Sequence, residues 1–234
     1  MPTDPSRLSI EELRRRFVQD GEAASGQFLN RLRRDRRRAA RQLHDLLRRR
    51  QERERAERLR LDSMLNFERV LWRSGLSRIA GVDEVGIGPL AGPVVAAAVV
   101  FPPGVEIAGV DDSKRLDPER REALAAEIRS SGAAIGIGVA EVAEIDRLNV
   151  FHAGCLAMRR AVEALPEPPQ HLLVDARELP ELAIPQNRFD KGDGIDFSIA
   201  AASIVAKTHR DRLMVGLARR HPEYGFARHK GYGT

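Results

Sequence analysis

The segment Gly81–Val100 constrains the fold more than any other part of the chain. Its sequence is GVDEVGIGPLAGPVVAAAVV. A short β-compatible run contains the adjacent acids Asp83 and Glu84, a Gly-x-Gly-Pro turn follows, and a run of small apolar residues comes after the turn. Because a tight turn between two such runs is typical of paired strands, the segment predicts two consecutive strands with two carboxylates near the end of the first.

The remainder of the C-terminal part contains further strand and helix signals. Strands are predicted over residues 78–85, 94–101, 133–139 and 171–175. Helices are predicted over residues 117–130, 146–165 and 198–220. The pair Asp117-Pro118 is typical of a helix start, because the acid can accept a free N–H group and proline lacks one. Ser198 is predicted to cap the last helix, and the whole order of elements predicts an α/β sandwich.

Charge is distributed unevenly along the chain. Residues 1–80 contain 21 Arg, no Lys and 12 acidic residues, a net charge of +9, whereas residues 81–234 contain 18 basic and 22 acidic residues, a net charge of −4. The arginines of the N-terminal part have two interpretations, and both stay open. They form either a solvated charged face or an additional set of phosphate contacts whose strength depends on salt.

The N-terminal part is predicted to be helical and separate from the rest. From Ser9 to about Arg73, apolar residues recur at three-to-four spacing without a proline, which predicts helix. A short Ser- and Gly-containing segment around Gly75 then precedes the first strand. We therefore expect an Arg-rich helical extension over residues 1–77 and an α/β domain over residues 78–234.

Composition excludes several other classes. The single Cys155 excludes an intramolecular disulfide and a Cys-rich zinc site. No apolar segment reaches the roughly 18 residues of a membrane span, and the N-terminus lacks the apolar core of a signal peptide. We expect a cytoplasmic protein that does not contact membranes.

Acidic residues near strand ends are the candidate site. Asp83 and Glu84 end the first strand, Asp175 ends a later one, and Asp211 lies on the closing helix one turn after Lys207. Acids at strand ends gather at one edge of a sheet, and carboxylates without Cys or paired His suit Mg²⁺ or Mn²⁺. Each acid also has a simpler explanation. Asp211 could pair with Lys207, Asp175 could cap a turn, and strand alternation would turn Glu84 to the opposite face.

The ordered motifs resemble bacterial ribonuclease HII, the type 2 ribonuclease H. The blocks are GVDEVGIGPLAGPVVAAAVV, DDSKRL, IDRLN, LLVDA, SIAAASIVAKTHRDRLM and HKGYGT. The resemblance covers residues 78–234, and the N-terminal helices are similar to an extension that some bacterial members carry. It implies a ribonuclease H-like fold, a mixed central sheet flanked by helices. It also implies four acidic ligands, namely Asp83, Glu84, Asp175 and Asp211.

The resemblance implies a metal-dependent endonuclease. Such an enzyme hydrolyses the RNA strand of RNA/DNA hybrids and cuts 5′ of ribonucleotides embedded in duplex DNA, leaving 3′-OH and 5′-phosphate ends. Two divalent ions, Mn²⁺ or Mg²⁺, about 4 Å apart would activate water and neutralise the leaving oxygen. The expected partners are hybrid duplexes and ribonucleotide-containing DNA, the expected role is removal of misincorporated ribonucleotides in replication and repair, and the expected state is a monomer.

Substrate contacts follow from the same resemblance. The implied residues are Gly86, Ile87, Gly88, Ser113, Lys114 and Tyr232. The glycine-rich turn and Tyr232 would recognise the 2′-hydroxyl that distinguishes RNA from DNA. Lys114 would contact a phosphate, with Ser113 beside it, and an ordinary polar turn is the less favoured alternative for both residues.

Two features depart from the family pattern. Position 87 is isoleucine where the family has arginine, which removes a fixed charge and predicts weaker or less selective binding. The chain stops at Thr234, where the family continues with a helical segment, so the domain is expected to be truncated and Tyr232 to lie near a free end.

Two other classes stay open. A catalytically impaired hybrid-binding relative is favoured by Ile87 and opposed by the retained acids. Another two-metal nuclease or integrase of the same general fold would share the acids but not the ordered blocks. A metal-dependent cleavage assay separates the first of these from an active enzyme.

Overall fold

A computed structural model describes residues 4–233 of the chain. The chain divides into two compact units, residues 1–60 and 61–234. Each unit has its own hydrophobic core. No helix in the described range is both long enough and apolar enough to cross a membrane.

The first unit is built from short helices that pack against the start of a long one. Its elements are η1 (Pro5–Arg7), α1 (Ile10–Arg14), the π-helical turn η2 (Arg15–Gln19), α2 (Gly26–Arg33) and α3 (Arg38–Met64), the last of which continues into the second unit. Its buried core contains Leu13, Phe17, Phe28, Leu32 and Leu43. The rings of Phe17 and Phe28 stack with centroids 4.2 Å apart.

The helical structure predicted from Ser9 to about Arg73 is confirmed, and it is divided into several helices. Gly21 adopts a φ of +72°, which ends the first helical stretch, and Ser25 caps a new helix by accepting from the N–H of Phe28. The chain breaks again before α3, and α4 (Asn66–Arg73) is a separate helix. The apolar periodicity continues across the breaks before α3 because the short helices and the start of α3 bury their apolar sides in one core. The apolar residues Leu61, Met64 and Leu65 are buried instead in the core of the second unit.

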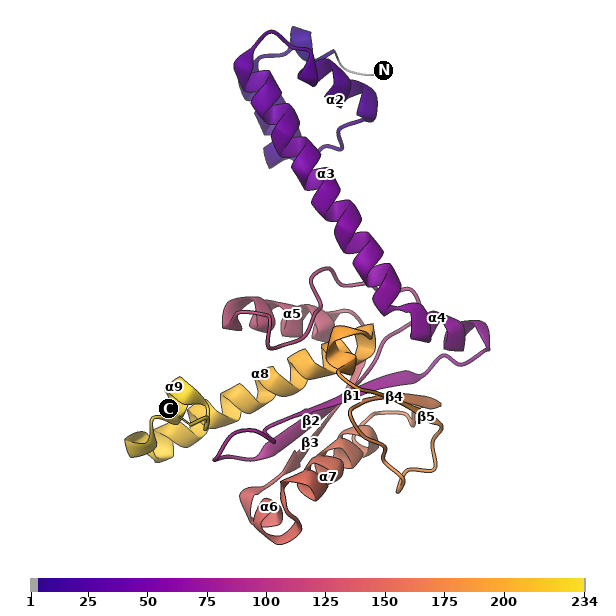
Figure 1. Cartoon of the computed structure of the whole chain (residues 1–234), viewed down its shortest axis with the longest axis vertical. Helices are drawn as coiled ribbons and strands as arrows, with labels where there is room; N and C mark the ends of the chain where they lie inside the picture. Colours follow the sequence, from indigo (N-terminus) through magenta and orange to yellow (C-terminus); the bar gives the residue numbers. More distant parts are fainter. Residues whose placement is uncertain (1–3, 234) are drawn as a thin grey trace. The chain divides into compact units, whose positions relative to one another are not determined.

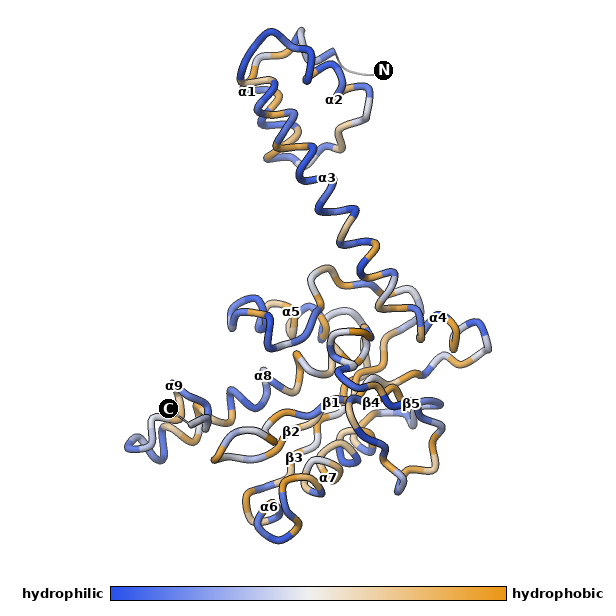
Figure 2. The backbone as a smooth tube through the Cα atoms, viewed as in Figure 1, coloured by the Kyte–Doolittle hydropathy of each residue, from blue (hydrophilic) through white to orange (hydrophobic). Residues whose placement is uncertain are grey.

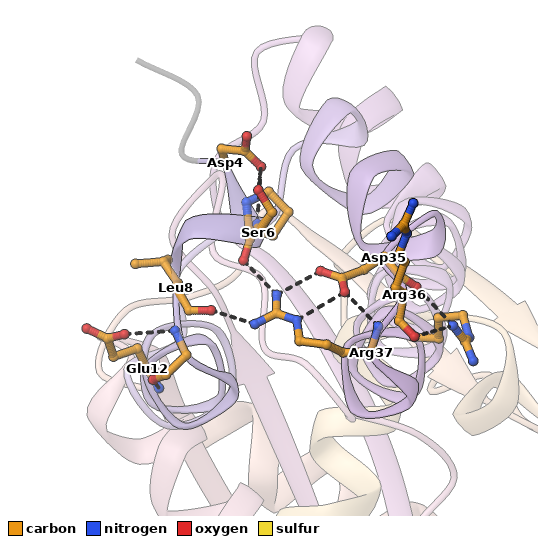
Figure 3. A network of polar contacts seen from close by, with 10 residues as sticks. Asp4, Ser6, Leu8, Glu12, Asp35, Arg36 and Arg37 are labelled. Atoms are coloured by element: carbon orange, nitrogen blue, oxygen red, sulfur yellow. Dashed lines mark hydrogen bonds and ion pairs between the residues drawn. The ribbon is translucent and has the colours of Figure 1, made fainter.

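Hydrogen bonds of Arg37 connect separate segments of the first unit (Figure 3). The guanidinium of Arg37 donates to both carboxylate oxygens of Asp35, at 3.0 and 2.7 Å. It also donates to the backbone oxygens of Leu8 and Pro5, at 2.7 and 2.9 Å. Arg37 therefore ties the N-terminal segment to the start of α3, so this arginine has a structural role.

The middle of α3 is polar on every side, and the tube in Figure 2 is mostly blue there. Arg48 pairs with Glu52 at 2.9 Å and Arg50 with Glu54 at 2.7 Å, each one turn along the helix. These exposed pairs are the kind expected of a solvated charged face, and each contributes little stability.

The second unit contains a mixed five-stranded sheet. Its strands are β1 (Ile79–Val85), β2 (Val94–Val100), β3 (Ala134–Ala140), β4 (His171–Asp175) and β5 (Gln186–Phe189), in the order β3-β2-β1-β4-β5. β1, β2 and β3 form an antiparallel meander, whereas β4 and β5 add in parallel register beside β1. The α/β class and the first four strands are confirmed. The edge strand β5 was not predicted, because its sequence QNRF has no apolar alternation.

Helices cover both faces of this sheet (Figure 1). α7 (Val150–Glu163) packs on one face and α8 (Phe197–Arg220) on the other. The unit also contains α4, α5 (Pro118–Ser130), α6 (Val142–Leu148) and α9 (Phe226–His229), with short turns η3 (Gly192–Gly194) and η4 (Pro222–Tyr224). Alternate residues of β2 enter two cores: Val95, Ala97 and Val99 pack with α8 and α5, while Val94, Ala96 and Ala98 pack with α7. The sheet is thus buried on both sides, as its unbroken apolar run indicates.

Glycine at position 81 lets α8 lie close against β1. A Cβ on Gly81 would lie 2.1 Å from the backbone carbon of Ser198, so glycine allows α8 to lie directly on β1.

The predicted N-cap Ser198 is wrong. Asp196 caps α8 by accepting from the N–H of Ile199 at 3.0 Å, and Ser198 is the second helical residue.

The helix predicted over residues 146–165 is two helices. Asn149 separates α6 from α7 with a φ of +69°, and its side chain accepts from the N–H groups of Phe151 and His152. An asparagine tolerates this left-handed backbone better than most residues, and it also caps the second helix. The predicted helix over residues 117–130 is confirmed, with Asp117 as its N-cap.

Candidate functional site: an acidic cluster at the end of the sheet

Three predicted acids meet where β1 and β4 end. Val82 pairs with Val174 in parallel register, so the next residues, Asp83 and Asp175, continue two adjacent strands. Together with Glu84 they offer carboxylate oxygens that all lie within 4.8 Å of one another. We call these three residues the acidic cluster. Strand alternation alone would have placed Glu84 elsewhere, but its carboxylate belongs to the same group.

Burial raises the pKa of every member of the acidic cluster. Asp83 is only 3% exposed, and burial followed by the charges of Glu84 and Asp175 raises the pKa of its carboxyl well above the usual range. Burial likewise raises the pKa of Glu84, against the opposing effect of Arg177. It also raises the pKa of Asp175, although the N–H of Gly192 donates to that carboxylate at 2.6 Å. Crowded carboxylates of this kind are stabilised when a cation binds.

The donor atoms of the acidic cluster suit a hard divalent cation. All three ligating groups are carboxylates, which favours Mg²⁺ or Mn²⁺ over zinc. Within the described residues, Oε2 of Glu84 is buried and has no hydrogen-bond partner. A buried oxygen without a partner is costly, and coordination to a cation would remove that cost. The residues therefore fit the divalent ions that the sequence indicated.

A fourth acid, Asp193, lies beside the acidic cluster and was not predicted. It is 4% exposed, it belongs to η3, and its charge contributes to raising the pKa of both Asp83 and Asp175. Lys114 donates to its Oδ2 at 3.0 Å, which brings that predicted phosphate contact to the same place. The motif Lys-Gly-Asp-Gly before α8 was the sequence feature that could have indicated Asp193. The position of this motif depends on the preceding strand β5, which was not predicted.

Asp211, the remaining acid of the prediction, is not part of the acidic cluster. Lys207 donates to it at 2.6 Å and Arg121 lies 3.6 Å away, so the simpler explanation of an ion pair describes its surroundings. It lines a cavity of about 650 Å³ between α5, α8 and α9. Tyr232 lines the same cavity, with its ring 5.7 Å from Nζ of Lys207. The predicted site residues therefore divide between two places.

The glycine-rich turn follows directly after β1. Gly86 has a φ of +112°, and a Cβ there would lie 2.7 Å from the backbone oxygen of Pro93, so this position requires glycine. Gly88 has open space around its Cα. Ile87 is partly buried and packs against the core that contains α7.

Ser113, a predicted substrate contact, is buried beside α8. It is 3% exposed, and its hydroxyl lies 2.8 Å from that of Ser203 on α8. Ser203 hydrogen bonds to Asp83 and opposes the rise of its pKa. The two serines therefore form a polar connection that ends at the acidic cluster.

Arg177 is a second residue that sequence reasoning missed. Its Nη2 donates to Oε1 of Glu84 at 3.0 Å, and both side chains are largely buried. It follows Asp175 by two positions, but nothing local in the sequence indicates that the chain turns back toward β1 at this point.

The comparisons with known proteins show the family. A family model described as Ribonuclease HII matches residues 80–234, and one described as Ribonuclease HII N-terminal domain matches residues 9–72. A ribonuclease HII of Myxococcus xanthus is 52% identical over 229 residues, 97% of this chain and 78% of that protein. One of Geobacillus thermodenitrificans is 53% identical over 203 residues, 87% of this chain and 78% of that protein.

A solved structure supports the same conclusion for the fold. The ribonuclease H2 of Pyrococcus horikoshii has a TM-score of 0.57 and 29% identity, covering 67% of this chain and 81% of its own. The resemblance and the ribonuclease H-like fold inferred from the sequence are confirmed.

Proposed function

This chain belongs to the ribonuclease HII family and is an endoribonuclease of RNA/DNA hybrids, and we propose that it also cuts 5′ of single ribonucleotides in duplex DNA. Cleavage would leave 3′-OH and 5′-phosphate ends. The supporting observation is the acidic cluster, a buried group of three carboxylates whose oxygens converge within 4.8 Å at the end of the sheet. Removal of misincorporated ribonucleotides in replication and repair is the proposed role, and a cytoplasmic, monomeric state stays a prediction.

The proposed chemistry uses divalent ions held by acids. When bound, two Mg²⁺ or Mn²⁺ ions would activate the attacking water and stabilise the leaving 3′-oxygen. Asp83, Glu84 and Asp175 would hold them, and we propose Asp193 as the fourth acid because its charge acts on two of these residues. Asp211 would not hold these ions, and it lines the cavity that Tyr232 also lines.

We propose that the substrate contacts lie on either side of these acids. Gly86, Ile87 and Gly88 would let the backbone approach the ribonucleotide, and Lys114, whose side chain is 75% exposed, would turn from Asp193 toward a phosphate. Tyr232 is 44% exposed, so its ring is accessible to a sugar. Ser113 is buried, and its proposed role is to hold Ser203, which in turn hydrogen bonds to Asp83.

The test is cleavage of an end-labelled duplex that contains one ribonucleotide, in Mg²⁺ and in Mn²⁺. Asp83→Asn should abolish cleavage, because a neutral amide holds the ions poorly, while hybrid binding without metal should persist. Asp190→Asn is the matched control, since Asp190 is an exposed acid with an 81% exposed side chain on the same edge of the sheet. This control should cut at the wild-type rate.

Each outcome decides between the candidate functions. An Asp83→Asn variant that cuts normally would refute the assigned site. A wild-type chain that binds hybrids but cuts in neither metal would favour the impaired hybrid-binding relative. Cleavage that produces 5′-hydroxyl ends would refute the proposed chemistry while leaving the nuclease activity in place.

A further inference from the structure

The pair of Arg177 and Glu84 is asymmetric. The side chains are 13% and 8% exposed, so the ion pair is nearly withdrawn from water. Nη2 of Arg177 donates to Oε1 of Glu84 at 3.0 Å, whereas Oε2, also buried, has no partner among the described residues. A buried carboxylate that exists only to neutralise an arginine would use both oxygens in a bidentate contact. Here one oxygen is held and the other is left available.

The backbone before Arg177 is strained. Ala176 has a φ of +58°, a left-handed conformation that is unfavourable for a residue with a Cβ. In the same turn the N–H of Arg177 donates to the backbone oxygen of Asp175 at 2.7 Å. This turn follows the end of β4 and places Arg177 so that its side chain contacts Glu84 on β1. Such strain persists only where the surrounding structure imposes it, and it is common at functional sites.

Helix α7 holds the guanidinium from a third direction. The guanidinium carbon of Arg177 lies 4.8 Å from the ring centroid of Phe151, and Nη1 of Arg177 donates to the backbone oxygen of Phe151 at 3.2 Å. A Cβ on Gly154 would lie 2.8 Å from Nη1 of Arg177 and 2.9 Å from Cδ1 of Ile87. The absence of a side chain at position 154 therefore makes room for both neighbours. The guanidinium is held by Glu84 on β1 and by Phe151 on α7, while its buried Nε has no hydrogen-bond partner among the described residues.

We propose that Arg177 is a positioning residue for Glu84. By holding Oε1, it fixes the carboxylate so that Oε2 is the oxygen presented to a divalent cation. The inference rests on the proposed function, because it takes Glu84 as a cation ligand. Removal of a residue that hydrogen bonds to a metal ligand typically lowers metal affinity or activity by about 10–100-fold.

Cation affinity distinguishes positioning from simple charge balance. A positive charge near the acidic cluster repels a divalent cation, so loss of the charge alone should tighten binding of Mn²⁺. Loss of positioning should weaken it. Titration of the full chain with MnCl₂ in a calorimeter measures this affinity directly, without substrate or turnover.

Arg177→Met should lower Mn²⁺ affinity about 10–100-fold. Arg177→Lys keeps the charge but not the planar fork, and its affinity should also fall below that of the wild type. Arg188→Met is the matched control, because Arg188 is on the edge strand and its side chain is 51% exposed. This substitution should leave the affinity for Mn²⁺ unchanged. Phe151→Leu, at a 53% exposed position, keeps the charge and removes only the ring, and should weaken affinity about two- to fivefold.

The outcomes separate this inference from the proposed function. If Asp83→Asn leaves Mn²⁺ binding unchanged, the assigned cation site fails. If Asp83→Asn removes binding but Arg177→Met retains or increases affinity, the site stands and the positioning role of Arg177 is refuted. Because Phe151→Leu leaves the buried pair in place, a fall in its affinity supports the inference even if Arg177→Met does not fold.

Discussion

Two acids with no role in the proposed chemistry face one another under α8. Glu68 of α4 is 1% exposed and Asp196, the N-cap of α8, is fully buried. Oε1 of Glu68 accepts from the N–H and hydroxyl of Ser198, at 3.0 and 2.6 Å. The second oxygens, Oε2 of Glu68 and Oδ2 of Asp196, have no partner outside the pair among the described residues. Two buried carboxylates cannot both stay ionised at little cost, so we expect the pair to retain a proton.

The direction of the pH dependence follows from the raised pKa values. Burial raises the pKa of Glu68, and burial together with the charge of Glu68 raises that of Asp196 well above its usual range. The folded protein therefore holds its proton to a higher pH than the unfolded chain does. Stability from this pair is complete below the unfolded pKa, near pH 4, and is lost as pH rises toward the folded pKa.

The substitution Glu68→Gln should therefore stabilise the protein at pH 7–8. Glutamine keeps an oxygen for Ser198, and its amide can donate to the unpartnered Oδ2 of Asp196. Satisfying a buried acceptor contributes about 1–3 kcal/mol. For a chain of this size, each kcal/mol corresponds to roughly 2–4 °C in Tm. Glu68→Ala is the matched opposite, because it leaves the N–H and hydroxyl of Ser198 without an acceptor and should destabilise.

Thermal melts of the wild type and both variants, at half-unit steps from pH 4 to pH 8, measure the effect. The Tm difference between Glu68→Gln and the wild type should be near zero at pH 4 and grow as pH rises. Other titrating groups cancel in this difference, since they are shared. A difference that stays constant across the range, or that shrinks as pH rises, would refute a shared proton between Glu68 and Asp196.

Three further predictions concern the site and the basic helices. In single-turnover assays, Asp193→Asn should slow cleavage at least tenfold more than Asp211→Asn; equal losses would restore Asp211 as the fourth acid. Deletion of residues 1–60 keeps Leu61 in the core of the second unit, and should flatten the salt dependence of hybrid affinity by about 0.9 for each phosphate that the deleted arginines neutralise; an unchanged slope would leave only a solvated face. Ala176→Gly relieves a φ of +58° and should raise Tm by roughly 2–4 °C, for a net gain near 1 kcal/mol; a lower Tm would contradict the strain.

Sequence alone determined the parts of this protein whose signals are local. The Gly81–Val100 segment predicted β1, the turn and β2, because alternation, glycine and small apolar residues act over a few positions. The pair Asp117-Pro118 located the start of α5 for the same reason. Membership of the family also came from ordered motifs. Three acids of the site, Asp83, Glu84 and Asp175, were predicted from their places on strands and from that resemblance, and the structure brings them together.

Only the tertiary structure decided which other groups join them. Asp193 depends on the edge strand β5, whose polar sequence has no local signature, while Asp211 has its partner one helical turn away. Arg177 reaches Glu84 through a strained turn, across 93 positions of the sequence. Glu68 reaches Ser198 across 130 positions. Such contacts are made by packing between distant segments, and residue spacing carries no information about which buried charges will face one another.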